Sequence, residues 1–328
     1  MAWDVREALR QGYISREDPL VYQQEMLMGQ GDGRLLRCHE LALPNLLGAT
    51  VLWDRCMDIT RLTYRGIPLA FAGKSAERLD AAVPFEQRFS GGMLYTCGLL
   101  NVGPGDAEQP THGRIHLQSA AMRSIRRDGD ALVLQGQMRE SALFGENLLL
   151  ERTLTFPLDR AEVQIRDAIT NQTQQEQPYM LLYHINLGYP LLSEHLRLQL
   201  PQGTHTVPAT AHASRHRAEL TCATAPQPDA QEQDFYHTLP IRDGYCAVAA
   251  ENPALGIGLS IRYRADTLPY LIQWRCLRSG DYVLGLEPAN HQVTGRAQAK
   301  ALPQIAPFET ITTEVRLQVY DLPGGTSG

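Results

Sequence analysis

The alternation of apolar and polar residues with a period of two limits what this chain can fold into. In the stretch GIGLSIRYRAD, the residues Ile257, Leu259, Ile261 and Tyr263 alternate with small or charged ones. Successive side chains of a β-strand point to opposite faces, so this pattern predicts a half-buried strand. The last segment repeats the pattern, with three apolar residues at alternate positions of 315–319.

Similar segments recur along the chain, and short turn signals separate them. The other strand-like stretches include RLTYRGIPLAF, ALVLQGQM, RTLTFPL, AEVQIRDAIT and DYVLGLEP. Turn signals occur at 128–130, 157–160, 242–245 and 279–282. No long amphipathic helix recurs between the strands, which disfavours a parallel α/β fold. We therefore predict an all-β protein, a large antiparallel β-sandwich.

Two segments differ from this pattern. In residues 1–34, Val5, Leu9 and Tyr13 have helical spacing and Asp4 is placed to cap a helix, so we expect a short N-terminal helical extension. Residues 35–328 are expected to form a single sandwich domain. Within it, 201–234 is rich in Pro, Thr, Ala and His and is predicted to be an irregular segment and a candidate border of a site.

Composition excludes several classes of function. The 328 residues are 43% hydrophobic, enough for a substantial core, and the net charge of −6 argues against binding nucleic acid or anionic membranes. No apolar run approaches the roughly 18–20 residues of a membrane span, and the N-terminus lacks a hydrophobic signal core. The six cysteines are scattered without a C-x-x-C pair, so we expect reduced, mostly buried thiols in a cytoplasmic protein.

The stretch MLLYHINLGYPLL (180–192) places an ionisable ring in an apolar run. As a strand it puts His184 and Asn186 on one face with Met180 and Leu182, close to a turn. One interpretation is a core histidine satisfied by a single hydrogen bond. The other is a catalytic group on the floor of a pocket.

Two further segments carry chemistry of the same kind. Glu287 ends the apolar strand GDYVLGLEP; a carboxylate on an apolar face has a raised pKa, which suits a general base, although it can equally be a salt-bridged or capping residue. Trp274 is flanked by Gln273 and Arg275, an arrangement that suits either a sugar-binding platform or a core position.

The motif THGRIH places His112 and His116 four residues apart. On a strand both would face one way and would suit a cupin-like metal site together with a carboxylate and another histidine. The chain around His112 is expected to be a loop, however, so we predict no metal and no other cofactor.

Taken together, eight segments in this order resemble the galactose mutarotase-like superfamily, and most closely its aldose 1-epimerase-related group, long described as a domain of unknown function. The segments are WDRCMDI, RFSGGMLYTCGLLNVG, HGRI, FGENLLLERTL, YHINLGYPLL, EQDFYH, LPYLIQW and GLEPANHQVTGR. The resemblance covers about residues 45–320. The resemblance implies a large antiparallel sandwich with a sugar site in one sheet. At one departure, Cys56 stands where a glycine is usual, which predicts no positive φ there.

The resemblance also implies residue roles. One histidine and one glutamate carry the family's chemistry, and by their order they correspond to His184 and Glu287. The substrate would be bound by His112, Arg88, Glu232, Trp274 and Asn186.

These roles predict an aldose 1-epimerase (mutarotase) that interconverts the α and β anomers of a free sugar. Glu287 would act as the base and a protonated His184 as the acid, on opposite sides of the sugar ring. The expected partner is a small sugar, with a homodimer formed through a sheet edge as a further possibility. The alternatives are a non-catalytic carbohydrate-binding or regulatory sandwich, and a metal-dependent sugar isomerase of the cupin type using His112, His116, His184 and Glu287.

Overall fold

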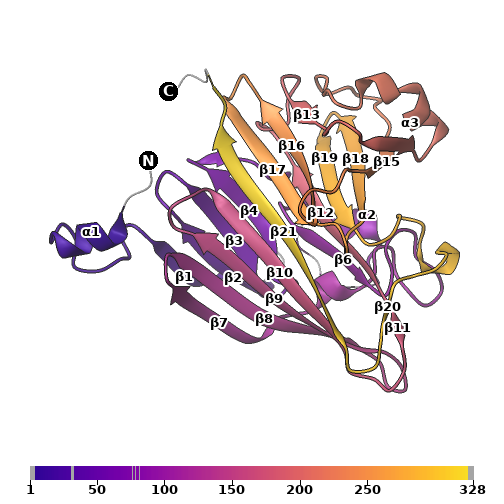
Figure 1. The fold of residues 1–328 in the computed structure, drawn as a ribbon, viewed down its shortest axis with the longest axis horizontal. Helices are drawn as coiled ribbons and strands as arrows, with labels where there is room; N and C mark the ends of the chain where they lie inside the picture. The colour runs from indigo at the N-terminus through magenta and orange to yellow at the C-terminus, as the bar shows by residue number, and fades with distance from the viewer. Residues whose placement is uncertain (1–3, 31–32, 76, 78, 81, 324–328) are drawn as a thin grey trace.

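The computed structural model describes residues 4–30, 33–75, 77, 79–80 and 82–323. They form mainly antiparallel sheets, which confirms the predicted all-β sandwich (Figure 1). In sheet order, the eight-stranded sheet comprises β13 (Arg197–Gln199), β16 (Tyr245–Asn252), β17 (Ile257–Arg264), β21 (Thr310–Asp321), β10 (Glu162–Asn171), β9 (Asn147–Pro157), β8 (Ala131–Ser141) and β7 (Ala121–Asp128).

Two further sheets face this one. The five-stranded sheet comprises β1 (Tyr22–Gly29), β2 (Leu35–Ala42), β3 (Leu47–Leu52), β4 (Asp58–Tyr64) and β5 (Ile67–Pro68). The six-stranded sheet comprises β14 (His205–Pro208), β15 (Gln233–Thr238), β18 (Tyr270–Arg278), β19 (Asp281–Ala289), β12 (Met180–Leu187) and β6 (Tyr95–Leu99). A β-bridge between Ala70 and Leu187 joins the end of the five-stranded sheet to β12 of the six-stranded sheet.

The remaining elements are short. A two-stranded ribbon pairs β11 (Gln177–Pro178) with β20 (Gln304–Ile305), and the helices are α1 (Val5–Arg10), α2 (Phe85–Arg88), α3 (Ala211–Arg215) and the 3₁₀ turns η1 (Ile115–Leu117), η2 (Arg217–Glu219) and η3 (Arg296–Gln298). In the part of the chain described above, no helix is long and apolar enough to cross a membrane.

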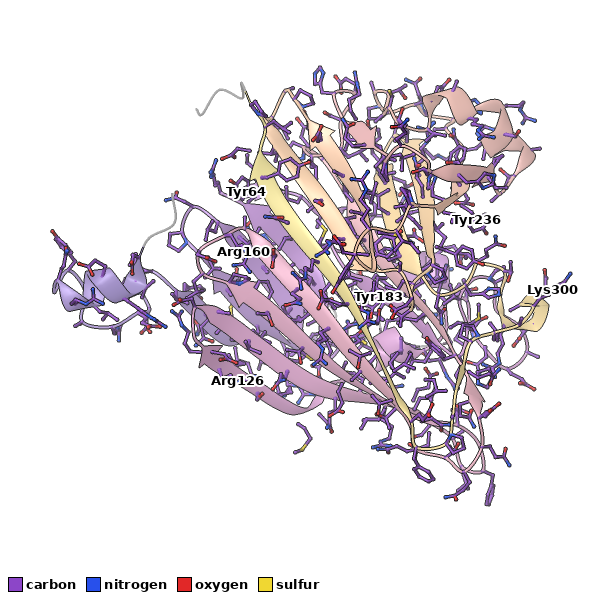
Figure 2. All side chains as sticks on the ribbon, in the orientation of Figure 1. Tyr64, Arg126, Arg160, Tyr183, Tyr236 and Lys300 are labelled. Carbon is purple, nitrogen blue, oxygen red and sulfur yellow. The ribbon has the colours of Figure 1, made fainter. Side chains whose placement is uncertain are left out.

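The main core lies between the eight-stranded sheet and the other two. It joins residues such as Ile165 and Leu317 of the larger sheet to Val51 of β3 and to Tyr183 and Ile185 of β12. Tyr183 lies in the middle of the molecule, while Lys300 lies at its edge (Figure 2). The strand faces are those that the alternation predicted, because burial of one apolar row per strand stabilises the register.

A second, smaller apolar cluster covers the other face of the six-stranded sheet. It contains Tyr95, Cys97, Met180, Leu182 and Ile272, with Phe85 and Phe89 packed against it from outside the sheet. The two faces of β12 therefore serve different layers, and residues of even number project into this second cluster.

Two expectations need correction. The N-terminal helix is limited to Val5–Arg10, capped by Asp4 as predicted, whereas Tyr22–Gly29 is a strand that pairs with β2, so the sheets begin before residue 35. Residues 1–3 and 31–32 of the predicted extension, and 324–328 of the predicted sandwich domain, lie outside the described residues. Cys56 and Met57 have φ of +49° and +54°, so the absence of glycine at 56 did not mean an ordinary backbone.

The six cysteines are free thiols, and all except Cys222 are buried. The expectation that the cysteines are mostly buried is therefore confirmed.

Candidate active site

His184 and Glu287 meet on the face of the six-stranded sheet that carries the second cluster. Strand β12 pairs with β19 so that Leu182 faces Ala289 and Ile185 faces Leu286, and this register sets His184 opposite Glu287. His184 Nε2 lies 3.2 Å from Glu287 Oε1, and the two residues are 5% and 2% exposed. The atoms are within ion-pair distance, but Glu287 Oε1 makes no aligned hydrogen bond.

The mechanism expected from the sequence places these two groups on opposite sides of a sugar ring, whereas the structure brings them into contact. Gly285 explains the position of the carboxyl group. It precedes Glu287 by two residues on the same face, and a Cβ at 285 would collide with Glu287 Oε1. The bare backbone of Gly285 thus leaves room for the carboxyl group to lie along β19 beside the imidazole.

Burial sets the protonation of the pair. It raises the pKa of Glu287 well above its usual value, with a smaller contribution from the charge of Asp234. It lowers the pKa of His184 to about 3, and His112 contributes in the same direction. The predicted protonated His184 is therefore not favoured; burial favours a neutral imidazole next to a protonated carboxyl group.

Aromatic rings surround the pair. Trp274 lies opposite Gly285 on β18, and its ring meets His184 edge to face at 5.2 Å between centroids. Phe89, just after α2, packs its ring 5.1 Å from those of both His184 and Tyr95 and 5.9 Å from Trp274. Trp274 is thus at the site.

The polar neighbours of Trp274 face away from the site. Gln273 contacts His237 on the opposite face, and Arg275 lies on that face too. The predicted platform of a tryptophan with adjacent amide and guanidinium donors is therefore not assembled on one face.

His112 reaches the site from the loop before η1. Its backbone adopts φ of +61°, an uncommon conformation for a residue with a side chain, and its N–H donates to Gly103 O at 3.0 Å. The ring lies 6.2 Å from that of His184, and its Nδ1 accepts from Gly103 N–H at 3.4 Å. Burial and then the charge of Arg88 lower the pKa of His112 to about 4, so it is a neutral ring whose Nε2 carries the hydrogen.

Arg88 holds the segment that carries His112. The residue is 1% exposed; one Nη contacts His116 Nε2 and the other donates to Thr111 O at 3.3 Å. Its two partners bracket His112 in the sequence. In this structure the guanidinium predicted to bind substrate directly is therefore occupied by the loop beside the site.

Asn186 shares the face of His184, as predicted. Its amide group donates to Gly92 O at 3.0 Å and to the backbone oxygen of His184 at 3.1 Å, while its Oδ1 has no hydrogen-bond partner. This residue connects β12 to the segment that leads into β6.

Glu232 is exposed and precedes β15, whereas Asp234 lies on the site face, opposite Trp274. Burial, and then the charge of Glu232, raise the pKa of Asp234 to about 6. Asp234 is the acidic residue of EQDFYH that acts on Glu287. The two acidic residues have the same strand parity, so alternation does not distinguish them; what does is that β15 begins at Gln233, after Glu232.

Buried polar atoms without a hydrogen-bond partner gather around this site. They include His184 Nδ1, Asn186 Oδ1 and Glu287 Oε1, with Arg88 Nε and His116 Nδ1 just behind. Such atoms are costly and uncommon in folded proteins, and they commonly mark functional positions.

Nothing in the sequence indicated that Phe89 belongs to the site, because an aromatic residue in an apolar segment is usually part of a core.

Within the described ranges, no group of three or more His, Cys, Asp or Glu side chains is arranged to hold a metal ion. The set required by a cupin-type isomerase is not assembled, because His116 Nε2 faces the Arg88 guanidinium. The segment 201–234 was predicted to be irregular, but it contains β14, α3 and η2. It does border a cavity, as expected, but that cavity lies on the other face of β15 and β18.

A family model described as a domain of unknown function, DUF4432, matches residues 34–319. The chain belongs to the DUF4432 family. No curated protein matches it.

Solved structures show which fold this DUF4432 protein shares. It resembles a putative aldose 1-epimerase from Klebsiella pneumoniae (TM-score 0.81, 19% identity, 93% of this chain and 86% of the other). It also resembles a galactose mutarotase-like protein from Clostridium acetobutylicum (TM-score 0.69, 12% identity, 93% of this chain and 100% of the other). A third similar structure is galactose 1-epimerase from Lactobacillus acidophilus (TM-score 0.62, 11% identity, 92% of this chain and 99% of the other). The predicted galactose mutarotase-like fold is thereby confirmed.

Proposed function

We propose that this protein is an aldose 1-epimerase in which His184 and Glu287 transfer the protons. The observation that carries the proposal is the buried contact of 3.2 Å between these two groups on one sheet face, walled by aromatic rings. The likeness of the fold to aldose 1-epimerases supports the same reaction class.

The reaction needs one group that donates a proton and one that accepts a proton. The C1 hydroxyl and the ring oxygen are bonded to the same carbon, so two adjacent side chains can serve both atoms. The raised pKa of Glu287 and the lowered pKa of His184 favour the proton on the carboxyl group at the start. This reverses the roles of acid and base that the sequence suggested.

The steps then balance. Glu287 protonates the ring oxygen as the C1–O5 bond breaks, and His184 takes the hydroxyl proton as C1 becomes an aldehyde. After rotation about C1–C2, the O5 hydroxyl attacks the other face of C1; Glu287 takes back its proton and His184 returns the other one to O1. The pair ends as it began, so no other reactant is consumed.

The surroundings suit substrate positioning. His112 Nε2 is available as a hydrogen-bond donor because Nδ1 accepts from Gly103. The partly exposed face of Trp274 provides apolar surface for the C–H groups of a sugar. His184 and Glu287 are almost completely buried and Phe89 packs its ring against His184, so we propose that a sugar reaches them by displacing that ring.

Saturation-transfer NMR on a panel of free aldoses tests the proposal. We expect the wild-type protein to accelerate anomer interconversion of at least one aldose, and Glu287→Gln to lose about 10²–10⁴-fold in rate. Glu194→Gln, at an exposed glutamate outside the site, is the matched control and should keep full rate. Full activity of Glu287→Gln would refute the assignment, and sugar binding without acceleration would indicate a carbohydrate-binding sandwich instead.

A further inference from the structure

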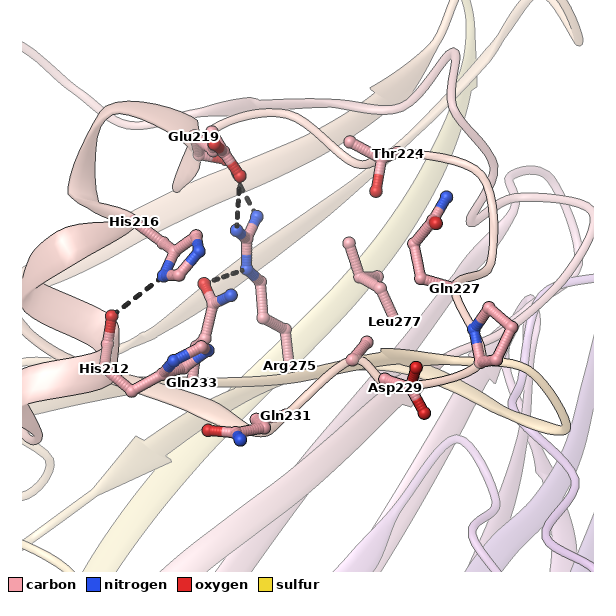
Figure 3. A pocket seen from close by; sticks show the side chains of 12 residues that line it. His212, His216, Glu219, Thr224, Gln227, Asp229, Gln231, Gln233, Arg275 and Leu277 are labelled. Carbon is pink, nitrogen blue, oxygen red and sulfur yellow. Dashed lines mark hydrogen bonds and ion pairs between the residues drawn. The ribbon is translucent and has the colours of Figure 1, made fainter.

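A cavity of about 360 Å³ is lined by Gln233 of β15 and Arg275 of β18, among other residues (Figure 3). It lies on the face of the sheet opposite to the one that carries His184 and Glu287. Its walls are α3 and η2, the loop 224–231, and the ends of the two strands. The volume is at the lower end of the range typical of small-molecule sites, about 300–1,000 Å³. Nothing in the proposed reaction uses it.

Arg275 fixes one wall of this cavity. Its Nε donates to Gln233 Oε1 at 2.8 Å, and one Nη donates to the backbone oxygens of Glu219 and Cys222, each at 2.8 Å. The other Nη lies 3.8 Å from the Glu219 carboxylate. The side chain of Gln233 is thereby oriented with its NH₂ group free of any partner among the described residues.

The loop that forms the opposite wall is attached to β18. Gln227 N–H donates to Leu277 O at 2.9 Å, and Ser279 N–H donates to Gln227 O at 3.0 Å. The hydroxyl of Tyr282 donates to Thr224 O. The cavity is therefore built by backbone hydrogen bonds rather than by a loose loop.

The lining favours an uncharged ligand with many hydroxyl groups. The two carboxylates of Glu219 and Asp229 outnumber the single guanidinium of Arg275 in the lining, so the cavity does not favour anions. His216 donates from Nδ1 to His212 O at 3.0 Å, as Figure 3 shows, which leaves its Nε2 as an acceptor. Amide groups, carboxylates and an imidazole acceptor together match hydroxyl groups, which both donate and accept.

We propose that this cavity binds a second molecule of a neutral sugar, behind the candidate active site. Gln233 and Arg275 are register partners, and so are Asp234 and Trp274, the next residues of the two strands. The first pair faces the cavity and the second pair faces His184 and Glu287. A sugar in the cavity therefore orders the same two strands that carry the site, without contacting the proton-transfer groups.

The double variant Asp229→Ala/Gln231→Ala tests this inference. Both residues line the cavity, are exposed and have side chains without partners in the described structure, so the protein should fold normally. Asp159→Ala/Gln202→Ala, at exposed positions elsewhere, is the control. Calorimetric titration with glucose, galactose, xylose and arabinose measures the affinity for each sugar. The dissociation constant of one binding event should rise by about tenfold or more in the cavity variant and not in the control, because two hydrogen-bonding side chains are lost.

A second measurement separates this inference from the proposed function. In the Glu287→Gln variant, hydrogen exchange of the segment 219–233 should slow when sugar is added. This protection should be lost in the triple variant that also carries Asp229→Ala and Gln231→Ala. Wild-type affinity and protection in the cavity variant would overturn the inference, even if the protein proved to be an epimerase. Binding of glucuronate or putrescine, but of no neutral sugar, to this segment would overturn it as well.

Discussion

Replacing Gly285 by alanine tests how the candidate active site is built. Gly285 does not have a positive φ, so the backbone accepts alanine, but the new Cβ would lie 3.2 Å from Trp274 Cε3 and would collide with Glu287 Oε1. The carboxyl group would have to retreat by about 1 Å to reach an ordinary van der Waals distance. Since a displacement of about 1 Å at a reacting group can cost about 10²-fold, we expect a comparable loss of anomer interconversion.

The fold should tolerate this change. Alanine removes conformational freedom from the unfolded chain, which stabilises by about 0.4–1 kcal/mol, and the crowding beside Glu287 offsets this gain by about 1–3 kcal/mol. Saturation-transfer NMR and urea unfolding measure the two effects separately. Gly29→Ala in β1, where the added Cβ meets only Leu35 at 4.0 Å, is the matched control. A wild-type rate for Gly285→Ala, or an equal loss for Gly29→Ala, would refute the reasoning.

Three further predictions concern charge. Burial raises the pKa of Glu287, so the folded protein retains a proton that the unfolded chain releases above about pH 4.5. The free energy of unfolding of the wild type, relative to that of Glu287→Gln, should therefore fall as the pH rises from there through the raised pKa. The fall should be at most about 1.4 kcal/mol per pH unit, and urea titrations measure it. The charge of Asp234 adds to the raised pKa of Glu287, so Asp234→Asn should move the alkaline limit of kcat/KM to lower pH, and an unmoved limit would contradict that coupling. Burial is the main cause of the low pKa of His112, and the charge of Arg88 is the second. NMR titration should therefore show a partial rise of the His112 pKa in Arg88→Met and no rise in Arg88→Lys, which keeps the charge.

The sequence was sufficient to predict which residues share a face of a strand, but not which strands lie next to one another in the sheet. Alternation along 180–187 correctly paired His184 with Asn186, and alternation along 281–287 correctly placed Glu287. That the two strands are neighbours, with a register that brings the side chains into contact, depends on the packing of the whole sheet. The expected placement of the two groups on opposite sides of a sugar ring was wrong for the same reason, because the room that Gly285 leaves for the carboxyl group is a property of the folded site.

Long polar side chains were the least predictable. Arg88 lies in the segment expected to form the site, but its contacts with Thr111 and His116 come from a distant loop that no local pattern identifies. The choice of Glu232 over Asp234 failed because it depended on where β15 begins, and strand boundaries are the least certain element of such readings.

The attachments on either side of Phe89 have a consequence for the size of the substrate. Arg88 is bonded to Thr111 O, and Ser90 accepts a hydrogen bond at 2.5 Å from the buried guanidinium of Arg55. The side chains on both sides of Phe89 are thus held, so the ring between them is the part that would move to open the site. Under the proposed function, an entrance one ring wide would admit a monosaccharide and exclude the interior units of a polysaccharide chain.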